Sequence, residues 1–460
     1  MVTADNLNLD VLELIFAFIS GNDLVAVSSV SKSFLAGVIP CLYATVSFTA
    51  KHAKRYRPEG GGIMSPFLTL RNHPDLAVHV RQIDIHCAPS IAGFAAGQIH
   101  PKFLSETADA LQVCKNLTSF VCGPRILPAL LGSLQGKERL QDLHIYAALT
   151  KTQGEMLQKI TTLRSLTLDY PTWNIVDSLT RWAQPLQRTL SHLTIFMSQE
   201  VNGILLEALL PLLPRLRGLH LIGCPKAPHT VVIKAATTHT PSLKEFSFTI
   251  FENTPSPSLF CLPTITLPSL QHLAIDVRPT SDATAMTMSS LFVSLTSLST
   301  LVLKFADRQL PIWNSVIDLI APPSAVTVPL KRLALMDCAV PIDMVGKLSS
   351  KCKDLEMLEI PLPIKDIQAF TAAISSLKEL HTLTDVGDAH ASHGPRATLA
   401  RNDVGYMMRT CMNLRTIVSD GRMWTGRPDC FIGVTVKHQR YKANATQHWF
   451  SPLKEYSYLS

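Results

Sequence analysis

Leucine recurs along the chain in a six-residue pattern, L-x-x-L-x-L, in which isoleucine or phenylalanine sometimes replaces leucine. Nine copies lie in one phase; the first and last start 215 residues apart, about 27 residues for each of the eight intervals. They start at Leu140, Leu163, Leu190, Leu216, Leu243, Leu270, Leu298, Leu330 and Leu355. This regularity indicates one repeated structural unit rather than several unrelated domains.

Each copy alternates apolar and polar residues, which predicts a short β-strand whose second and third leucines are buried. Helical spacing appears between copies, as in Val345, Leu348 and Cys352. One such unit cannot bury its own apolar face, so neighbours have to stack. The period falls within the roughly 20–29 residues of leucine-rich repeats. The sequence therefore predicts an α/β leucine-rich-repeat solenoid over 76–419, with a parallel sheet on the concave face and helices outside.

Two features modify the repeat. Cysteine occupies the ninth position of two copies, at Cys224 and Cys338, where we expect buried thiols that bond the backbone of the adjacent turn. The longest interval contains Pro322 and Pro323, which predict a looped insertion.

The pattern fades after Leu414, where an alternating segment over 431–437 predicts one more strand. We expect residues 420–460 to form a C-terminal capping unit, because a solenoid has to cover its last core layer.

The first fifty residues do not follow the repeat. Their apolar residues fall in three stripes with helical spacing: Leu12, Ile15, Phe16 and Ile19; Leu24, Val27 and Val30; Phe34, Leu35 and Ile39. They predict three short helices, the last of which ends at Pro40. So small a core is not stable by itself, so the module is expected to dock on the solenoid or on another chain.

The stretch from Leu7 to Phe34 resembles an F-box. The positions that carry the resemblance are Leu7, Asp10, Leu12, Ile15, Phe16, Asp23, Leu24, Val30, Ser31, Lys32 and Phe34. Asn8 departs from the family, which usually has a proline there that pre-sets the first helical turn. The segment from Leu42 to Phe48 looks like the strand that follows the F-box in many fungal members. The resemblance covers residues 5–48, and 49–75 is interpreted as a linker with a first irregular repeat.

The resemblance to F-box/leucine-rich-repeat proteins implies a substrate-recognition subunit of a Skp–cullin–F-box (SCF-type) ubiquitin ligase. The helices would bind a Skp-type adaptor, which bridges to the cullin scaffold, and the repeats would hold an unknown protein substrate. The chain would be non-catalytic and would supply proximity. The implied adaptor-binding residues are Leu7, Leu12, Ile15, Phe16, Ile19, Leu24, Val27, Val30 and Phe34. Of these, Leu12, Ile15, Phe16, Leu24 and Val27 are expected either on the docking surface or in the small core under it. The alternative is a leucine-rich-repeat interaction scaffold with no link to a ligase, in which the first helices only cap the solenoid.

The third, fifth and seventh positions of each copy alternate with the buried leucines, so they are expected on the outward, concave side of the sheet. Apolar residues there are not needed for folding and predict a protein-binding surface. The candidate substrate-binding residues are Tyr146, Asp169, Phe196, Ile222, His220 and Asp276. The alternative is that the cap or a C-terminal segment of the same chain covers this surface.

Composition narrows the classes of protein to which the chain can belong. The 460 residues are 47% hydrophobic and 17% charged, which predicts a large core rather than disorder. No apolar run is long enough for a membrane span, and the start of the chain lacks the basic region of a secretory signal. Ten scattered cysteines without a C-x-x-C pair fit a reducing cytoplasmic or nuclear location. The net charge of +7 is dispersed, which argues against a nucleic-acid partner.

The sequence carries none of the common catalytic signatures, G-x-S-x-G, G-x-x-x-x-G-K-[ST], G-x-G-x-x-G or H-E-x-x-H. His390 and His393 give an isolated H-x-x-H, which we interpret as chance. No catalytic residue, cofactor or metal is therefore expected.

Overall fold

The structure is a computed structural model. The residues that it describes are 7–19, 21–57, 63–90, 98–251, 267–278, 288, 291–292, 295–306, 320, 329–387, 398–429, 433–440 and 448–453. The proline insertion at Pro322 and Pro323 and the pair His390 and His393 lie outside them.

The chain begins with three helices, as the apolar stripes predicted: α1 (Leu9–Phe16), α2 (Asn22–Ser28) and α3 (Lys32–Tyr43). Ser31 caps α3, because its Oγ accepts a hydrogen bond of 3.2 Å from the backbone N–H of Phe34. The predicted end at Pro40 is wrong, since α3 continues through it to Tyr43. Pro40 lies near the end of the helix. Because proline has no backbone N–H, only one hydrogen bond of the last turns is lost there.

These helices enclose a small core of Leu12, Phe16, Leu24 and Val38. Gly37 lets α1 approach α3 closely, because a Cβ added there would lie 2.8 Å from Cβ of Leu12.

The chain divides into two compact units: unit 1, Met1–Glu200 together with Leu453–Ser460, and unit 2, Val201–Pro452. In unit 1 the strands pair in chain order and in parallel: β1 (Thr45–Phe48), β2 (Gln82–Ile85), β3 (Ser119–Cys122), β4 (Asp142–Tyr146), β5 (Ser165–Asp169) and β6 (His192–Phe196). The helices are α4 (Ala50–Arg55), α5 (Pro66–Asn72), α6 (Pro74–Ala77), α7 (Pro101–Val113), α8 (Leu127–Leu134), α9 (Lys151–Leu157) and α10 (Trp173–Leu186).

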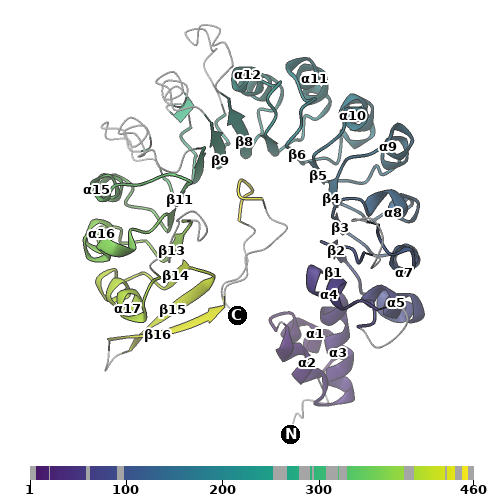
Figure 1. Ribbon diagram of the computed structural model, residues 1–460, viewed down its shortest axis with the longest axis horizontal. Helices are drawn as coiled ribbons and strands as arrows, with labels where there is room; N and C mark the ends of the chain where they lie inside the picture. Colours follow the sequence, from purple (N-terminus) through teal and green to yellow (C-terminus); the bar gives the residue numbers. More distant parts are fainter. Residues whose placement is uncertain are drawn as a thin grey trace. The chain divides into compact units, whose positions relative to one another are not determined.

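The repeated leucines hold these strands in register. Leu166 of β5 pairs with Leu143 on one side and Leu193 on the other, and all three are buried. Helices α7–α10 of unit 1 lie on one side of the strands of that unit, and α11, α12 and α15–α17 do so in unit 2 (Figure 1). The core therefore sits between strands and helices, and we call the opposite side of the sheet the strand face.

The segment interpreted as a linker contains regular structure. Helix α4 begins directly after β1, and its capping residue Thr49 donates its backbone N–H to Nδ1 of His52 at 3.2 Å. The hydroxyl of buried Tyr56 then donates to a carboxylate oxygen of Glu106 at 3.2 Å. Burial and the neighbouring Glu106 carboxylate raise the pKa of Tyr56, so the hydroxyl keeps its proton. This part of the chain is therefore anchored to unit 1.

Unit 2 continues the same architecture. Its parallel strands are β7 (Gly218–Ile222), β8 (Glu245–Ile250), β9 (His272–Val277), β10 (Thr300–Phe305), β11 (Arg332–Met336), β12 (Met357–Ile360), β13 (Thr382–Asp385) and β14 (Thr416–Ser419). Its helices include α11 (Gly203–Leu209), η2 (Leu210–Leu212), α12 (His229–His239), α15 (Ile342–Lys351), η4 (Ile364–Asp366), α16 (Ile367–Ile374) and α17 (Arg401–Thr410). The repeat period thus predicted the solenoid correctly.

Two antiparallel strands follow: β15 (Arg422–Asp429) pairs with β14, and β16 (Gly433–Arg440) pairs with β15. Strand β16 contains residues 433–437 of the predicted alternating segment, and the first two residues of that segment lie outside the described part of the chain. Its Val436 is buried, and the carbonyl of Val436 accepts a hydrogen bond of 3.0 Å from the Arg401 guanidinium of α17. Within the described part of the chain, no helix has the length and apolar character that crossing a membrane requires.

Candidate functional site

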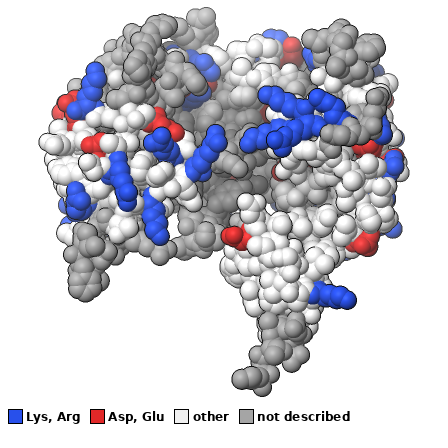
Figure 2. All heavy atoms as spheres, turned by 60° about the horizontal axis from the view of Figure 1, so that its bottom comes forward, with Lys and Arg blue, Asp and Glu red and all other residues white. Residues whose placement is uncertain are grey.

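The outer surface of the three N-terminal helices is apolar. Phe18 is 77% exposed and Leu14 is 68% exposed, although both are large hydrophobic residues. The other exposed large hydrophobic residues of this module are Leu9, Val11, Ile15, Val25, Val30, Leu35 and Leu42. Few charged side chains interrupt this surface, which is mostly white at the lower centre of Figure 2. We call these nine residues the apolar face of the module.

The structure separates the predicted adaptor-binding residues into three groups. Ile15 and Val30 belong to the apolar face. A second group is partly buried and packs against the module core: Leu7, Ile19, Val27 and Phe34. The remaining three, Leu12, Phe16 and Leu24, form the small core beneath the surface, which is one of the two placements expected for them. They are buried because α3 packs on their side of α1, where the rings of Phe16 and Phe34 lie 5.3 Å apart.

Sequence reasoning missed the most exposed part of this surface. Val11, Leu14 and Phe18 form a second stripe with spacings of three and four residues, beside the stripe that became the core. The signal was available, because a short helix that is apolar nearly all round has to be covered on more than one side.

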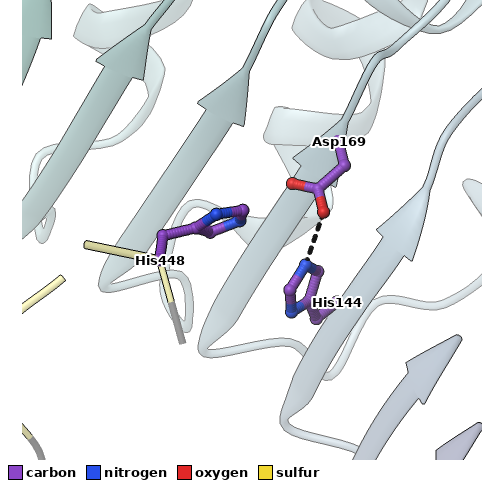
Figure 3. A group of neighbouring side chains, drawn as sticks. All are labelled: His144, Asp169 and His448. Carbon is purple, nitrogen blue, oxygen red and sulfur yellow. Dashed lines mark hydrogen bonds and ion pairs between the residues drawn. The ribbon is translucent and has the colours of Figure 1, made fainter. Parts of the chain in front are cut away.

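The strand face of unit 1 brings three predicted substrate-binding residues together. Tyr146, Asp169 and Phe196 end adjacent strands in one register row, and all three are partly exposed. Asp169 also accepts a hydrogen bond: its Oδ2 lies 2.8 Å from Nε2 of His144 on the neighbouring strand (Figure 3).

An additional aromatic residue joins this row. Tyr170 is 44% exposed, and its ring centroid lies 5.2 Å from that of Tyr146 and 5.8 Å from that of Phe196. Its φ of 50° is left-handed, so the chain turns at the end of β5. The strand pattern alone did not predict Tyr170, because this turn lies outside the alternation. We call Tyr146, Tyr170 and Phe196 the aromatic row.

The remaining predictions, on the strand face of unit 2, are wrong as to exposure. Ile222, His220 and Asp276 are 1%, 3% and 1% exposed. The alternative that a C-terminal segment covers this surface applies in unit 2: Phe450 is completely buried, with its ring centroid 5.7 Å from that of His220. The backbone carbonyl of Phe450 lies 2.7 Å from Nε2 of His272.

Two titratable groups on this face have shifted pKa values. Burial lowers the pKa of His272 to about 3, so the ring is neutral at physiological pH and Nε2 donates its proton to the Phe450 carbonyl. Burial raises the pKa of Asp276, although the guanidinium of Arg278 opposes the shift at 2.8 Å. Both shifts arise from burial of the two side chains on this face.

The comparisons with known proteins agree with the division of the chain into an N-terminal helical module and a repeat solenoid. The F-box domain family matches residues 5–36. No curated protein matches the chain. The chain therefore carries an F-box domain, and its repeats form a leucine-rich-repeat solenoid.

Among solved structures, the chain is similar to one titled as a complex of Rad7 and Elc1 in yeast, with 17% identity, coverage of 85% of this chain and 90% of that one, and a TM-score of 0.44. It is also similar to the leucine-rich-repeat-containing protein LegL7 from Legionella pneumophila, with 12% identity, coverage of 80% and 97%, and a TM-score of 0.33. An internalin from Listeria monocytogenes has 14% identity, coverage of 75% and 83%, and a TM-score of 0.30. These scores lie below 0.5, so the fold rests on the strands and helices of the chain itself.

Proposed function

We propose that the protein is the substrate-recognition subunit of an SCF-type ubiquitin ligase. The observation that carries this proposal is the apolar face of the F-box domain. Nine large hydrophobic side chains are exposed on a module of fewer than fifty residues. Exposed large hydrophobic side chains that gather on one small module commonly mark a binding site for another protein.

The chemistry of this face fits a helical adaptor of the Skp type, which in turn reaches a cullin. Leu14 and Phe18 are the most exposed of its residues and are suited to enter apolar pockets of the partner. Aromatic residues at the centre of an interface commonly carry much of the binding free energy.

The solenoid is the part suited to hold a protein substrate. The aromatic row offers large rigid side chains on a strand face, and such residues are enriched in protein interfaces. The chain would act through proximity, by holding substrate lysines near a ubiquitin-conjugating enzyme, and would perform no bond chemistry.

Point variants test the adaptor interaction better than a deletion of residues 1–48. Such a deletion would also remove buried Phe48, whose ring centroid lies 4.7 Å from that of Phe103 in the solenoid core. We expect the double variant Leu14→Asp, Phe18→Asp to lose adaptor and cullin in affinity purification. Ile204→Asp is the matched control, because Ile204 is 84% exposed on α11 in unit 2, outside the module.

The reason for the expected loss is that an unpaired charge placed in an apolar interface costs several kcal/mol. If the double variant captures the adaptor as well as the wild type does, the F-box does not function as an adaptor-binding domain. The interaction scaffold without a ligase would then be the better explanation.

A further inference from the structure

The short C-terminal segment His448–Pro452 has the features of a bound peptide. It forms a turn, in which the backbone N–H of Ser451 donates to the carbonyl of His448 at 3.1 Å. Phe450 at its centre is completely buried. Described residues of this segment form no β-bridge to a strand, so the segment is held by side chains of the strand face rather than by sheet pairing. Figure 1 draws it in yellow on the strand side of unit 2.

Polar side chains lie beneath Phe450. His220, Ser247 and His272 form the floor under Phe450, and Nδ1 of His220 is 2.7 Å from Oγ of Ser247. An apolar floor would require a permanent cover, whereas hydroxyl and imidazole groups can bond water when the cover leaves. The leucines and phenylalanines of β7–β9 are buried, and they alternate with the floor residues along the strands, so they face the opposite, helix side of the sheet. The repeat core therefore does not depend on the segment.

The contacts define what the floor recognises. Nε2 of His272 donates to the backbone carbonyl of Phe450, and a residue of any type can offer such a carbonyl. Selectivity therefore has to come from the side chain of the residue that occupies the position of Phe450. That side chain is an aromatic ring, whose centroid lies 5.7 Å from that of His220 in the floor. Within the segment the same ring stacks on His448, with a centroid distance of 4.9 Å. The preceding Trp449 lies under the ammonium group of Lys304, 5.3 Å from the ring centroid. Cation–π contacts of this kind favour an aromatic ligand.

Charges around the floor are paired with one another. Asp276 lies 2.8 Å from Arg278, and Arg332 lies 2.7 Å from Glu359. Two more charged groups adjoin the floor: Lys304 lies 3.8 Å from Asp337, and Glu245 lies 3.6 Å from His220. Among the described residues, the charges therefore form no cluster of one sign that would select a strongly acidic or basic partner. The chemistry fits a neutral turn with two consecutive aromatic residues.

We infer that the strand face of β7–β9 is a binding site for an aromatic peptide turn of a protein substrate, and that His448–Pro452 occupies it as a built-in competitor. The inference rests on the proposed function of the solenoid as the substrate-binding part. A tethered competitor acts at an effective concentration on the order of 1 mM, so it would exclude weak ligands and admit those that bind more tightly or at several points.

The test uses the full chain and a labelled peptide of residues 446–453, Thr-Gln-His-Trp-Phe-Ser-Pro-Leu. We expect the variant Phe450→Ala to bind this peptide about a hundredfold more tightly than the wild type. The reason is that a tethered competitor at roughly 1 mM, with a Kd near 10 µM for the site, raises the apparent Kd of the added peptide about a hundredfold. The same peptide with alanine in place of phenylalanine should not bind. Adding His220→Ala to the Phe450→Ala variant should weaken binding, because it removes one ring that contacts the phenylalanine.

Hydrogen exchange of the wild type gives a second measurement that does not depend on the folding of a variant. Excess peptide should remove protection from the backbone N–H of Ser451 and leave the strands of unit 2 protected. A folded Phe450→Ala variant with no gain in peptide affinity would overturn the inference. If that variant does not fold, unchanged protection of Ser451 in the wild type would overturn it. Adaptor capture should be normal in Phe450→Ala, so failure here is distinguishable from failure of the proposed F-box function.

Discussion

Two phenylalanines of the F-box domain are two positions apart in sequence but have opposite surroundings, and they allow core and docking roles to be separated. Phe16 is 3% exposed and belongs to the module core, whereas Phe18 is 77% exposed on the apolar face. We therefore predict that Phe16→Ala reduces the free energy of unfolding of the module, and that Phe18→Ala reduces only its affinity for the adaptor.

The magnitudes follow from the burial. Removing a fully buried phenylalanine ring costs about 3–5 kcal/mol, which combines the lost transfer free energy with the cavity left behind. Phe16 belongs to a buried cluster of four residues, so this loss should unfold the module. Phe18→Ala removes little buried area, and its effect on unfolding should stay within about 0.5 kcal/mol. A central aromatic contact contributes about 2 kcal/mol to binding, which weakens the adaptor Kd about thirtyfold.

The free energy of unfolding is measured by chemical denaturation followed by circular dichroism, together with limited proteolysis of the N-terminal helices. The adaptor Kd is measured by titration calorimetry with purified adaptor. The reasoning would be refuted if Phe18→Ala bound the adaptor with wild-type affinity. It would also be refuted if Phe18→Ala destabilised the module as much as Phe16→Ala, because Phe18 would then be part of the core.

Three further predictions concern buried groups. Burial raises the pKa of the Cys338 thiol to about 12, so a thiol reagent should label it only on unfolding; rapid native labelling would contradict the register of the repeats. Gly37→Ala should destabilise the F-box by about 1–3 kcal/mol, because its Cβ would overlap Leu12, while Gly132→Ala, with no atom within 4 Å, should be neutral or slightly stabilising in the same denaturation assay. The folded pKa of His272 lies below its unfolded value near 6.5, so its contribution to the unfolding free energy should be fully present above pH 6.5 and decline as the pH falls towards about 3. Replacing His272 by Gln should flatten this part of the pH profile, and an unchanged profile would show that His272 is accessible to protons in the fold.

The sequence alone determined the solenoid and the F-box helices, because both depend on contacts between residues that are near in the chain. The leucine period specifies a strand in each repeat, and each strand pairs with strands of neighbouring repeats, as Leu143, Leu166 and Leu193 do. Stripes with helical spacing likewise predicted three helices at the right places. Pro40 predicts an earlier end of the third helix than the structure shows, because a proline in the last turn of a helix does not stop it.

Only the tertiary structure decided which surfaces are free. Helix α1 carries apolar residues on more than one side, and its packing against α3 buries Phe16 and leaves Phe18 exposed. On the strand face of unit 2, Ser247 and Phe450 come together although 203 residues separate them in the chain. Periodicity reports which side of an element is apolar, but it carries no information on which distant segment covers that side. That choice depends on the complementarity of two surfaces, which exists only once both have folded.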